Sequence, residues 1–275
     1  MKYLILGSAG QIGAALVKKL TDMRHRVETF DIVDSDLEDL RLFNNKALDE
    51  KLDSTDFVFF LAFDVGGSPY LKKHQHTFDF LNNNMLIMSN TFKKIKEKNK
   101  KFIFTSSQMS NMDFSPYGLA KAIGEQYTKS LEGLTVKFWN IYGPEKDLEK
   151  SHVITNFILK AKSTKSIYML SDGLETRQFL HVDDCCDCLY LLSQQYDDLN
   201  KDKQFHITSF KWNSILEVAQ IISSHYDNVN IIPSSTKDEV QKNIQNEPSD
   251  YILNFWQPKI DLRSGILKII NEMEQ

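Results

Sequence analysis

Short hydrophobic runs alternate with longer amphipathic segments through the first half of the chain. The runs at residues 2–6, 27–30, 57–61, 102–105 and 135–139 predict strands, and the segments 11–23, 77–98 and 116–131 predict helices. The run at 57–61 shows no polar alternation, which indicates a strand covered on both faces. Strand–helix alternation of this kind predicts an α/β fold with a doubly wound parallel sheet of the Rossmann type. From about residue 145 the alternation is lost, which indicates a smaller lobe at the sheet edge.

Composition and charge exclude several classes of protein. The 41% hydrophobic and 25% charged residues are typical of a folded domain, and a net charge of -4 disfavours nucleic-acid phosphates as the main ligand. No apolar run is long enough to cross a bilayer or to form a signal peptide. The three cysteines, Cys185, Cys186 and Cys188, lie too close together for a disulfide framework. We therefore expect a cytoplasmic protein with neither a nucleic-acid nor a membrane partner.

A glycine-rich turn follows the first predicted strand directly. Gly7, Gly10 and Gly13 are spaced to allow a tight turn, close approach to a pyrophosphate, and close packing of helix on strand. The helix that opens at Gln11 and Ile12 directs its free N–H groups toward the phosphates. The turn therefore predicts a dinucleotide site; the alternative is a glycine-rich turn without a ligand.

An acidic residue, Asp31, follows the second predicted strand. A carboxylate there accepts hydrogen bonds from ribose hydroxyls and repels a 2′-phosphate, which favours NAD over NADP. The alternative is an aspartate that only begins a turn, because Asp34, Asp36 and Asp39 crowd the same segment.

The segment from Ser115 to Lys121 carries the candidate catalytic residues. Ser115 and Pro116 suit a helix start, so Tyr117 and Lys121 lie four residues apart on one helix face. A lysine ammonium near the phenol, together with an oxidised nicotinamide, favours the phenolate, which can take a proton from a sugar hydroxyl. Ser107 ends a run of hydroxyls at the carboxyl end of a predicted strand, where ligands bind in open α/β sheets.

Together these motifs resemble the extended short-chain dehydrogenase/reductases of the nucleotide-sugar epimerase/dehydratase family. The family's features occur in order along nearly the whole chain: Gly7, Gly10, Gly13, Asp31, Leu61-Ala62, Asn84, Thr105-Ser106-Ser107, Tyr117, Lys121, Asn140-Ile141-Tyr142-Gly143-Pro144, Arg177 to Asp184, and Phe255 to Pro258. The resemblance implies a Rossmann domain at 1–144 with a returning segment at about 179–208. The regions 145–178 and 209–275 then form the nucleotide-sugar lobe.

The resemblance also assigns roles to single residues. It implies that Leu61, Ala62 and Asn84 contact NAD, and that Asp36 and Leu37 lie near the adenine. Ser107 resembles the partner of the reacting sugar hydroxyl, and Asn140 and Arg177 resemble residues that hold the substrate diphosphate. The cysteines become small core side chains rather than a metal site, and we expect no metal. Segments 77–98 and 116–131 match the helices that relatives pair in a homodimer.

Departures from the family narrow the reaction. The segment from Asp31 to Leu37 is short, so the third strand is reduced or missing, and residues 245–250 lack a second arginine clamp. Ser107 is followed by Gln108 and Met109 rather than by the Asp-Glu pair of dehydratases or the cysteine of 3,5-epimerases. What remains is oxidation or reduction at carbon 4, as a 4-epimerase, a 4-dehydrogenase or a keto-sugar reductase. Residues 61–67 and 84–90 resemble the branch of the family that acts on GDP-sugars, which implies a GDP-sugar. An NAD-bound regulatory protein remains the alternative of another class.

Overall fold

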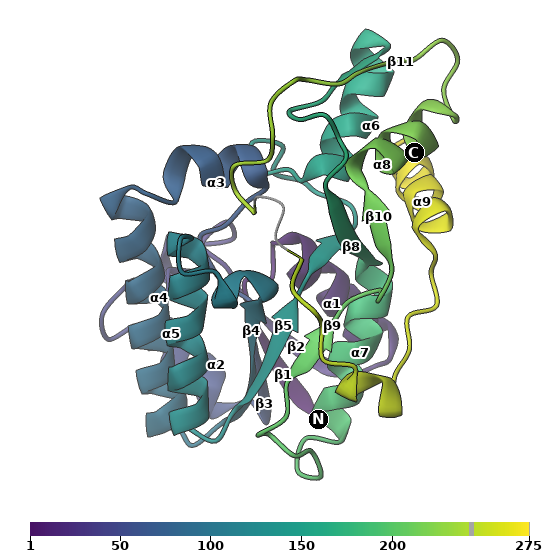
Figure 1. The fold of residues 1–275 in the computed structure, drawn as a ribbon. Helices are drawn as coiled ribbons and strands as arrows, with labels where there is room; N and C mark the ends of the chain where they lie inside the picture. Colours follow the sequence, from purple (N-terminus) through teal and green to yellow (C-terminus); the bar gives the residue numbers. More distant parts are fainter. Residues whose placement is uncertain (242–244, 275) are drawn as a thin grey trace.

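The fold is built on one parallel sheet of six strands. The structure, a computed structural model, describes residues 1–241 and 245–274. The strands follow the order β2-β1-β3-β4-β5-β9 and every neighbouring pair is parallel (Figure 1). Their bounds are β1 Lys2–Leu6, β2 Arg26–Phe30, β3 Phe57–Phe60, β4 Lys101–Ser107, β5 Leu134–Phe138 and β9 Phe205–Ile207. The predicted α/β class is confirmed.

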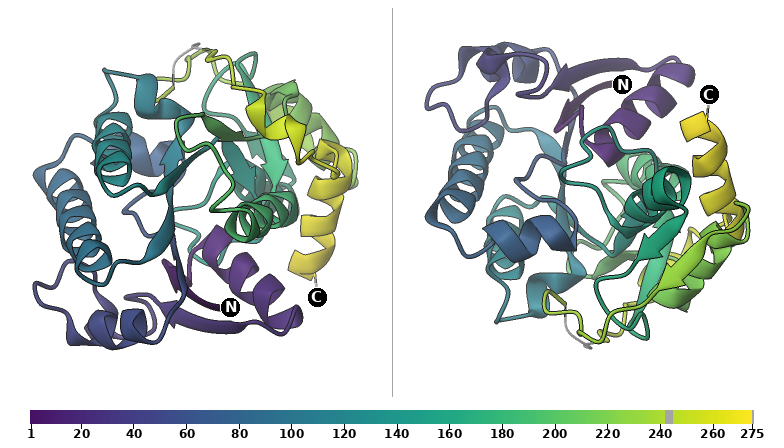
Figure 2. Two further views of the ribbon diagram at one scale, coloured as in Figure 1. Left: turned by 90° about the horizontal axis from the view of Figure 1, so that it is seen from below. Right: turned by 90° about the horizontal axis from the view of Figure 1, so that it is seen from above.

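Helices cover both faces of this sheet (Figure 2). On one face lie α1 (Gln11–Asp22) and α7 (Val182–Gln194); on the other lie α2 (Lys46–Asp53), α4 (Phe78–Glu97) and α5 (Pro116–Ser130). Phe57 and Phe59 of β3 join the hydrophobic cluster of α1 and α7, whereas Val58 and Phe60 join that of α4. Because each face is buried, the strand needs no polar positions.

The shortened segment after β2 does remove a strand. Between Asp31 and Asp56 the chain forms only a 3-10 turn, Asp36–Glu38, and helix α2, so β2 is the edge of the sheet. This confirms the prediction from the short spacing. Helix α2 and a further helix, α3 (Ser68–His74), were not predicted.

A smaller lobe lies beside the carboxyl ends of the large sheet. It contains a three-stranded sheet of β10 (Trp212–Ser214), β8 (Thr176–His181) and β6 (Asn140–Tyr142), and a pair of β11 (Asn230–Ile232) and β7 (Ser166–Tyr168). Helices α6 (Val153–Thr164), α8 (Ile215–Ser223) and α9 (Leu262–Glu274) share one hydrophobic cluster with these strands. Since α7 and β9 return to the large sheet, we keep the division into 1–144 with 179–208, and 145–178 with 209–275, as a proposal.

The three cysteines lie together in the hydrophobic core. Cys185, Cys186 and Cys188 are buried in α7, and burial raises the pKa of each thiol, so they are core side chains as predicted.

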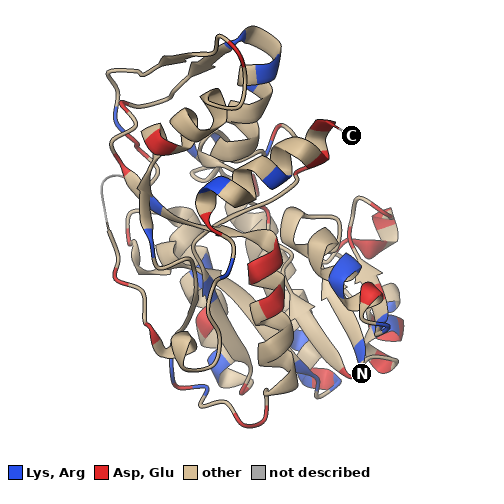
Figure 3. Ribbon diagram, turned by 90° about the vertical axis from the view of Figure 1, so that its right-hand side faces the viewer, with Lys and Arg blue, Asp and Glu red and all other residues tan. Residues whose placement is uncertain are grey.

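Within the described residues no helix is long and apolar enough to span a membrane. Acidic and basic residues are interspersed over both lobes in Figure 3 rather than gathered in one basic stripe.

Candidate active site

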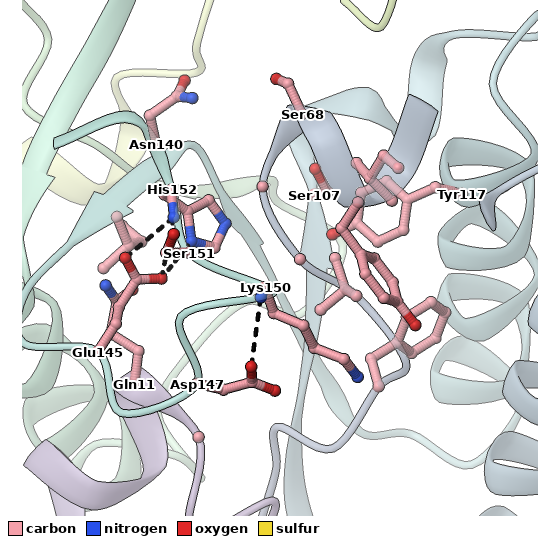
Figure 4. A pocket seen from close by; sticks show the side chains of 18 of the residues that line it. Gln11, Ser68, Ser107, Tyr117, Asn140, Glu145, Asp147, Lys150, Ser151 and His152 are labelled. Atoms are coloured by element: carbon pink, nitrogen blue, oxygen red, sulfur yellow. Dashed lines mark hydrogen bonds and ion pairs between the residues drawn. The ribbon is translucent and has the colours of Figure 1, made fainter. Parts of the chain in front are cut away.

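A cavity of about 970 Å³ lies between the carboxyl ends of the large sheet and the smaller lobe. Its wall includes a residue at or just beyond the end of each of the first five strands of this sheet: Gly7, Asp31, Leu61, Ser107 and Phe138. Side chains of the smaller lobe and of the segment before α6 form the opposite wall (Figure 4). This is the place where open α/β sheets bind their ligands.

The glycine turn closes one end of the cavity. Gly7 has a φ of +87°, and a Cβ at Gly13 would lie 2.0 Å from the Gly7 carbonyl oxygen, so neither position accepts a side chain without strain. Gly10 caps α1 without any side-chain hydrogen bond, which leaves the helix N-terminus facing the cavity. Gln11, Ile12 and Gly13 line the same wall, and the Gln11 amide donates to the Gly143 carbonyl over 3.1 Å.

Asp31 is fixed beside the glycine turn. One carboxylate oxygen accepts from the Ala9 N–H at 2.9 Å, and the other accepts from the Val33 N–H at 3.0 Å. The side chain therefore sits beside the glycine turn, and its contact with a ribose stays a prediction.

The adenine-side prediction for Asp36 and Leu37 differs from the structure. Neither Asp36 nor Leu37 is among the described residues that line the cavity, and Leu37 is 70% exposed. The cavity is lined instead by Asp39, Leu40 and Arg41. The Arg41 guanidinium donates three hydrogen bonds to the Asp39 carboxylate. The reason is local: Asp36 and Leu37 belong to the 3-10 turn, which directs them outward before the chain returns to α2.

Asn84 also differs from its predicted place. It is fully buried behind the cavity wall, where its amide accepts from the Asp64 N–H at 2.8 Å and donates to the Asp64 and Phe80 carbonyls. Its neighbour Asn83 lines the cavity instead. Asn84 therefore shapes the loop after β3, while Leu61 and Ala62 of that loop line the cavity, and their contact with NAD stays a prediction.

The candidate catalytic residues do converge. Ser115 caps α5 by accepting from the Gly118 N–H at 3.1 Å, and Pro116 takes the first helical position. This places Tyr117 in the cavity wall together with Ser107, the last residue of β4. Burial raises the pKa of Tyr117 to about 12, and the nearby Ser107 hydroxyl offsets part of that rise.

Lys121 lies one helical turn further along and is almost fully buried. Its ammonium donates to the Thr105 carbonyl at 2.7 Å and sits 3.7 Å from the centre of the Phe63 ring, whereas the centre of the Tyr117 ring is 6.0 Å away. Burial lowers the pKa of Lys121 to about 7. In the protein alone burial is the largest effect on both pKa values, and the lowered Tyr117 pKa, which also needs an oxidised nicotinamide, stays a prediction.

The predicted diphosphate residues lie on the opposite wall. The Asn140 Oδ1 atom is buried and has no hydrogen-bond partner among the described residues, so it can accept from a ligand. Arg177 is buried in β8 and forms an ion pair with Asp238. In the segment that lacks a second arginine, Gln245 and Asn246 hydrogen-bond Thr176 and Gln108.

Sequence reasoning missed an acid–histidine pair in the same wall, in which the Glu145 carboxylate is buried and the His152 ring is partly exposed. The Glu145 carboxylate contacts the His152 ring nitrogen Nδ1 at 2.6 Å and accepts from the His152 backbone N–H at 3.0 Å (Figure 4). Burial acts to raise the pKa of Glu145, but the bonds and charge of His152 outweigh it and hold this pKa below its usual range. Glu145 follows Pro144 directly, but His152 lies seven residues further on, so no local spacing linked the two.

These features fit a bound dinucleotide. The glycines leave space that a Cβ would fill, the α1 N-terminus is open, and Asp31 faces the ribose position. Within the described residues no group of three or more histidine, cysteine or acidic side chains is placed to hold a metal ion.

The model of the NAD dependent epimerase/dehydratase family matches residues 3–208. The chain belongs to this family. Membership supports NAD as the cofactor, in agreement with the prediction from Asp31.

Curated relatives are distant. A putative UDP-glucose 4-epimerase of Methanocaldococcus jannaschii is 29% identical, and the match spans 58% of this chain and 53% of that protein, about half its length. GDP-mannose 3,5-epimerase 1 of Oryza sativa subsp. indica is 27% identical over 82% of this chain and 69% of its own length. GDP-L-fucose synthase of Sinorhizobium fredii is 23% identical over 96% and 92%.

Solved structures share the fold over the whole chain. An epimerase of Methanothermobacter thermautotrophicus superposes with a TM-score of 0.85 at 19% identity, covering 99% of this chain and 92% of that one. A GDP-6-OMe-4-keto-L-xylo-heptose reductase of C. jejuni gives a TM-score of 0.82 at 20% identity, covering 99% and 97%. At these identities the likeness establishes the fold alone.

Proposed function

We propose that this protein is an NAD-dependent enzyme that oxidises or reduces carbon 4 of a sugar in a nucleotide sugar. The observation that carries the proposal is the convergence of Ser107, Tyr117 and Lys121 on one cavity. That cavity has the glycine turn at one end and Arg177 in the opposite wall, so it has room and charge for a dinucleotide and a second diphosphate.

The roles of the catalytic residues follow from their positions. NAD, when bound, supplies the acceptor or the donor of the hydride exchanged with carbon 4. In the oxidation, Tyr117 takes the proton of the 4-hydroxyl as the carbon–oxygen bond becomes a carbonyl, and Ser107 hydrogen-bonds the reacting oxygen. The Lys121 ammonium, when protonated, stabilises the phenolate that this requires. Gln108 and Met109, which follow Ser107, offer no carboxylate or thiol for removing water or a carbon-bound proton.

Three net reactions are compatible with this chemistry. A 4-epimerase returns the hydride to the other face, a 4-dehydrogenase releases the keto sugar, and a reductase acts on a keto sugar from another enzyme. GDP is the proposed nucleotide, supported by relatives named for GDP-mannose and GDP-fucose. A regulatory NAD-binding protein would not need Ser107, Tyr117 and Lys121 in the wall of one cavity.

A substrate deuterated at carbon 4 tests this proposal and separates the three reactions. An epimerase keeps the deuterium at carbon 4 of an inverted product, and a dehydrogenase transfers it to NAD. A reductase does not act on the deuterated sugar. Instead it transfers deuterium from labelled NADH to carbon 4 of a keto sugar. Deuterium lost to water, or a reaction at another carbon, would contradict the assignment to carbon 4.

We also propose that the protein forms a homodimer through α4 and α5. Leu119, Ile123 and Tyr127 of α5 are 47%, 43% and 40% exposed and lie four residues apart, which makes one apolar stripe. Leu81 of the adjacent α4 is exposed on the neighbouring helix. A second copy of this chain would bury such a stripe against its own equivalent.

A further inference from the structure

One edge of the cavity is formed by alternate residues of β8 and by the residue that directly precedes it, Glu175. Phe179, Arg177 and Glu175 all line the cavity, and residues two apart in an extended chain point to the same side. Asn140 is paired with Phe179 in the β6–β8 register. Each step of two residues spans about 6.6 Å, so Glu175 lies roughly 13 Å along the strand from the level of Asn140. The order from Asn140 through Arg177 to Glu175 therefore leads away from the large sheet.

The far end of this series holds a carboxylate in partly apolar surroundings. Glu175 Oε1 accepts from the Ser171 hydroxyl at 2.5 Å, and the buried Ser171 is in turn held by the loop before β8. Met169, Leu170 and Ile215 line the cavity beside them, and Leu170 is 64% exposed. A carboxylate has about four lone-pair sites, so Glu175 can accept further hydrogen bonds after binding Ser171.

We propose that Glu175 selects guanine as the base of the nucleotide substrate. The inference rests on the proposed function, which places the diphosphate at Arg177 and so leads the base toward Glu175. Guanine presents two adjacent donors, N1–H and the 2-amino group, and these match the two oxygens of a carboxylate. The pair is charge-assisted and bidentate, the geometry that gives such contacts both strength and specificity.

Each of the other bases would place at least one hydrogen-bond acceptor opposite this carboxylate. Uracil and thymine flank their single N–H with two carbonyl oxygens, and adenine and cytosine place a ring-nitrogen acceptor beside the amino group. A carboxylate opposite these acceptors is repulsive, and specificity of this kind comes from the mismatch as much as from the match. Leu170 and Ile215 offer the apolar contact that the face of any base requires, so they add affinity without selecting among bases.

The test measures nucleoside diphosphate binding to the NAD-loaded protein by calorimetry, because saturation with NAD keeps the ligands out of the cofactor site. The probes are GDP, IDP (which lacks the 2-amino group), UDP and ADP. Wild type should bind GDP about tenfold or more tightly than IDP or UDP. Glu175→Gln should weaken GDP binding about tenfold or more and leave UDP binding unchanged or stronger, since an amide can pair with uracil.

A matched control is Asp172→Asn. Asp172 lies three residues earlier, accepts from the Leu174 N–H at 3.0 Å and is not among the described cavity residues, so its loss of charge should not change base preference. Thermal melting shows whether each variant is folded.

The outcomes separate this inference from the proposed function. If no nucleoside diphosphate binds the NAD-loaded wild type, the proposed function fails. If all four bind equally, or if Glu175→Gln weakens GDP and UDP alike as a contact to the ribose hydroxyls would, the guanine assignment is overturned and the proposed function stands. Preference for GDP that survives in Glu175→Gln overturns it as well.

Discussion

At the scale of single residues, burial decides the electrostatics of the catalytic pair. The sequence placed Tyr117 and Lys121 on one helix face, but their protonation depends on how much solvent the fold excludes. In the structure burial raises the pKa of Tyr117 to about 12 and lowers that of Lys121 to about 7. The centre of the Phe63 ring lies 3.7 Å from the ammonium, and this contact stabilises the charged lysine and offsets part of the fall in its pKa.

The lowered pKa of Lys121 predicts a pH-dependent stability cost. The folded pKa lies below that of an unfolded lysine, so the unfolded chain binds more protons between about pH 7 and 10.4, and stability rises with pH across this range. Lys121→Met removes the titrating group. It should therefore stabilise the fold by a few kcal/mol at pH 7, and by much less at pH 10. Thermal unfolding of both proteins at the two pH values measures this, and an equal gain at both would contradict the burial of a titrating lysine.

The glycine turn gives a second prediction at this scale. A Cβ at Gly13 would lie 2.0 Å from the Gly7 carbonyl oxygen, whereas one at Gly10 would lie 3.4 Å from the same atom. Gly13→Ala should lower the free energy of unfolding by about 2–4 kcal/mol, because the helix must move off the strand. The variant should also lose most of the co-purifying NAD. Gly10→Ala serves as the milder control. Equal NAD content in the two variants, read from the absorbance released on denaturation, would refute the close-packing explanation.

At the scale of elements, the start of α5 positions the tyrosine. Ser115 accepts from the Gly118 N–H and donates to the Gln75 side chain, and it is fully buried. Ser115→Ala should cost about 1–2 kcal/mol and lower kcat, since Tyr117 sits two residues later. Ser214→Ala removes an equivalent cap from α8, whose Ser214 accepts from the Glu217 N–H at 3.0 Å. Comparable melting temperatures with kcat reduced only in Ser115→Ala are expected; a matching loss of kcat in both would show that the cap has no positioning role.

The exposed stripe of α5 predicts how the chain assembles. Ile123→Glu places a charge in the proposed interface and should convert a dimer into a monomer, as measured by light scattering after gel filtration. Lys129→Glu changes the charge at an exposed position of the same helix outside the stripe and should leave the dimer intact. A monomeric wild type, or a dimer in Ile123→Glu, would contradict this interface.

Element prediction succeeded where the hydrophobic pattern was strong. The strands and helices with long apolar runs were located within a few residues of their observed bounds, and the missing third strand was expected because the segment after Asp31 is shorter than in the family. Helices α2 and α3 were missed because their apolar positions are few, as in Lys46–Asp53, where only Leu48 and Leu52 are buried. The resemblance to the family predicted Asp36 and Leu37 near the adenine, whereas in the structure Asp39 and Leu40 line the cavity.

At the scale of the whole molecule, two lobes bring together residues from distant parts of the chain. Local motifs identified the glycine turn, Asp31 and the Tyr117–Lys121 pair, because each is defined by close spacing. Glu145, His152 and Glu175 could not be found in this way, since they line the cavity only after the smaller lobe folds against the large sheet. The same separation explains Asn84, which a motif placed at the cofactor but packing placed behind the wall.

The central claim is that Tyr117 drives NAD-dependent redox chemistry on a nucleotide sugar. NAD-loaded wild type and Tyr117→Phe would be incubated with a panel of GDP-, UDP- and dTDP-linked sugars and 4-keto sugars, and the products separated from the substrates by chromatography and then analysed by mass spectrometry. Wild type should convert at least one substrate to an isomer of equal mass or to a product that differs by two hydrogens. Tyr117→Phe should be slower by about 10²–10⁴-fold with its NAD content unchanged. Inactivity of the wild type toward the whole panel, or full activity of Tyr117→Phe, would contradict the claim.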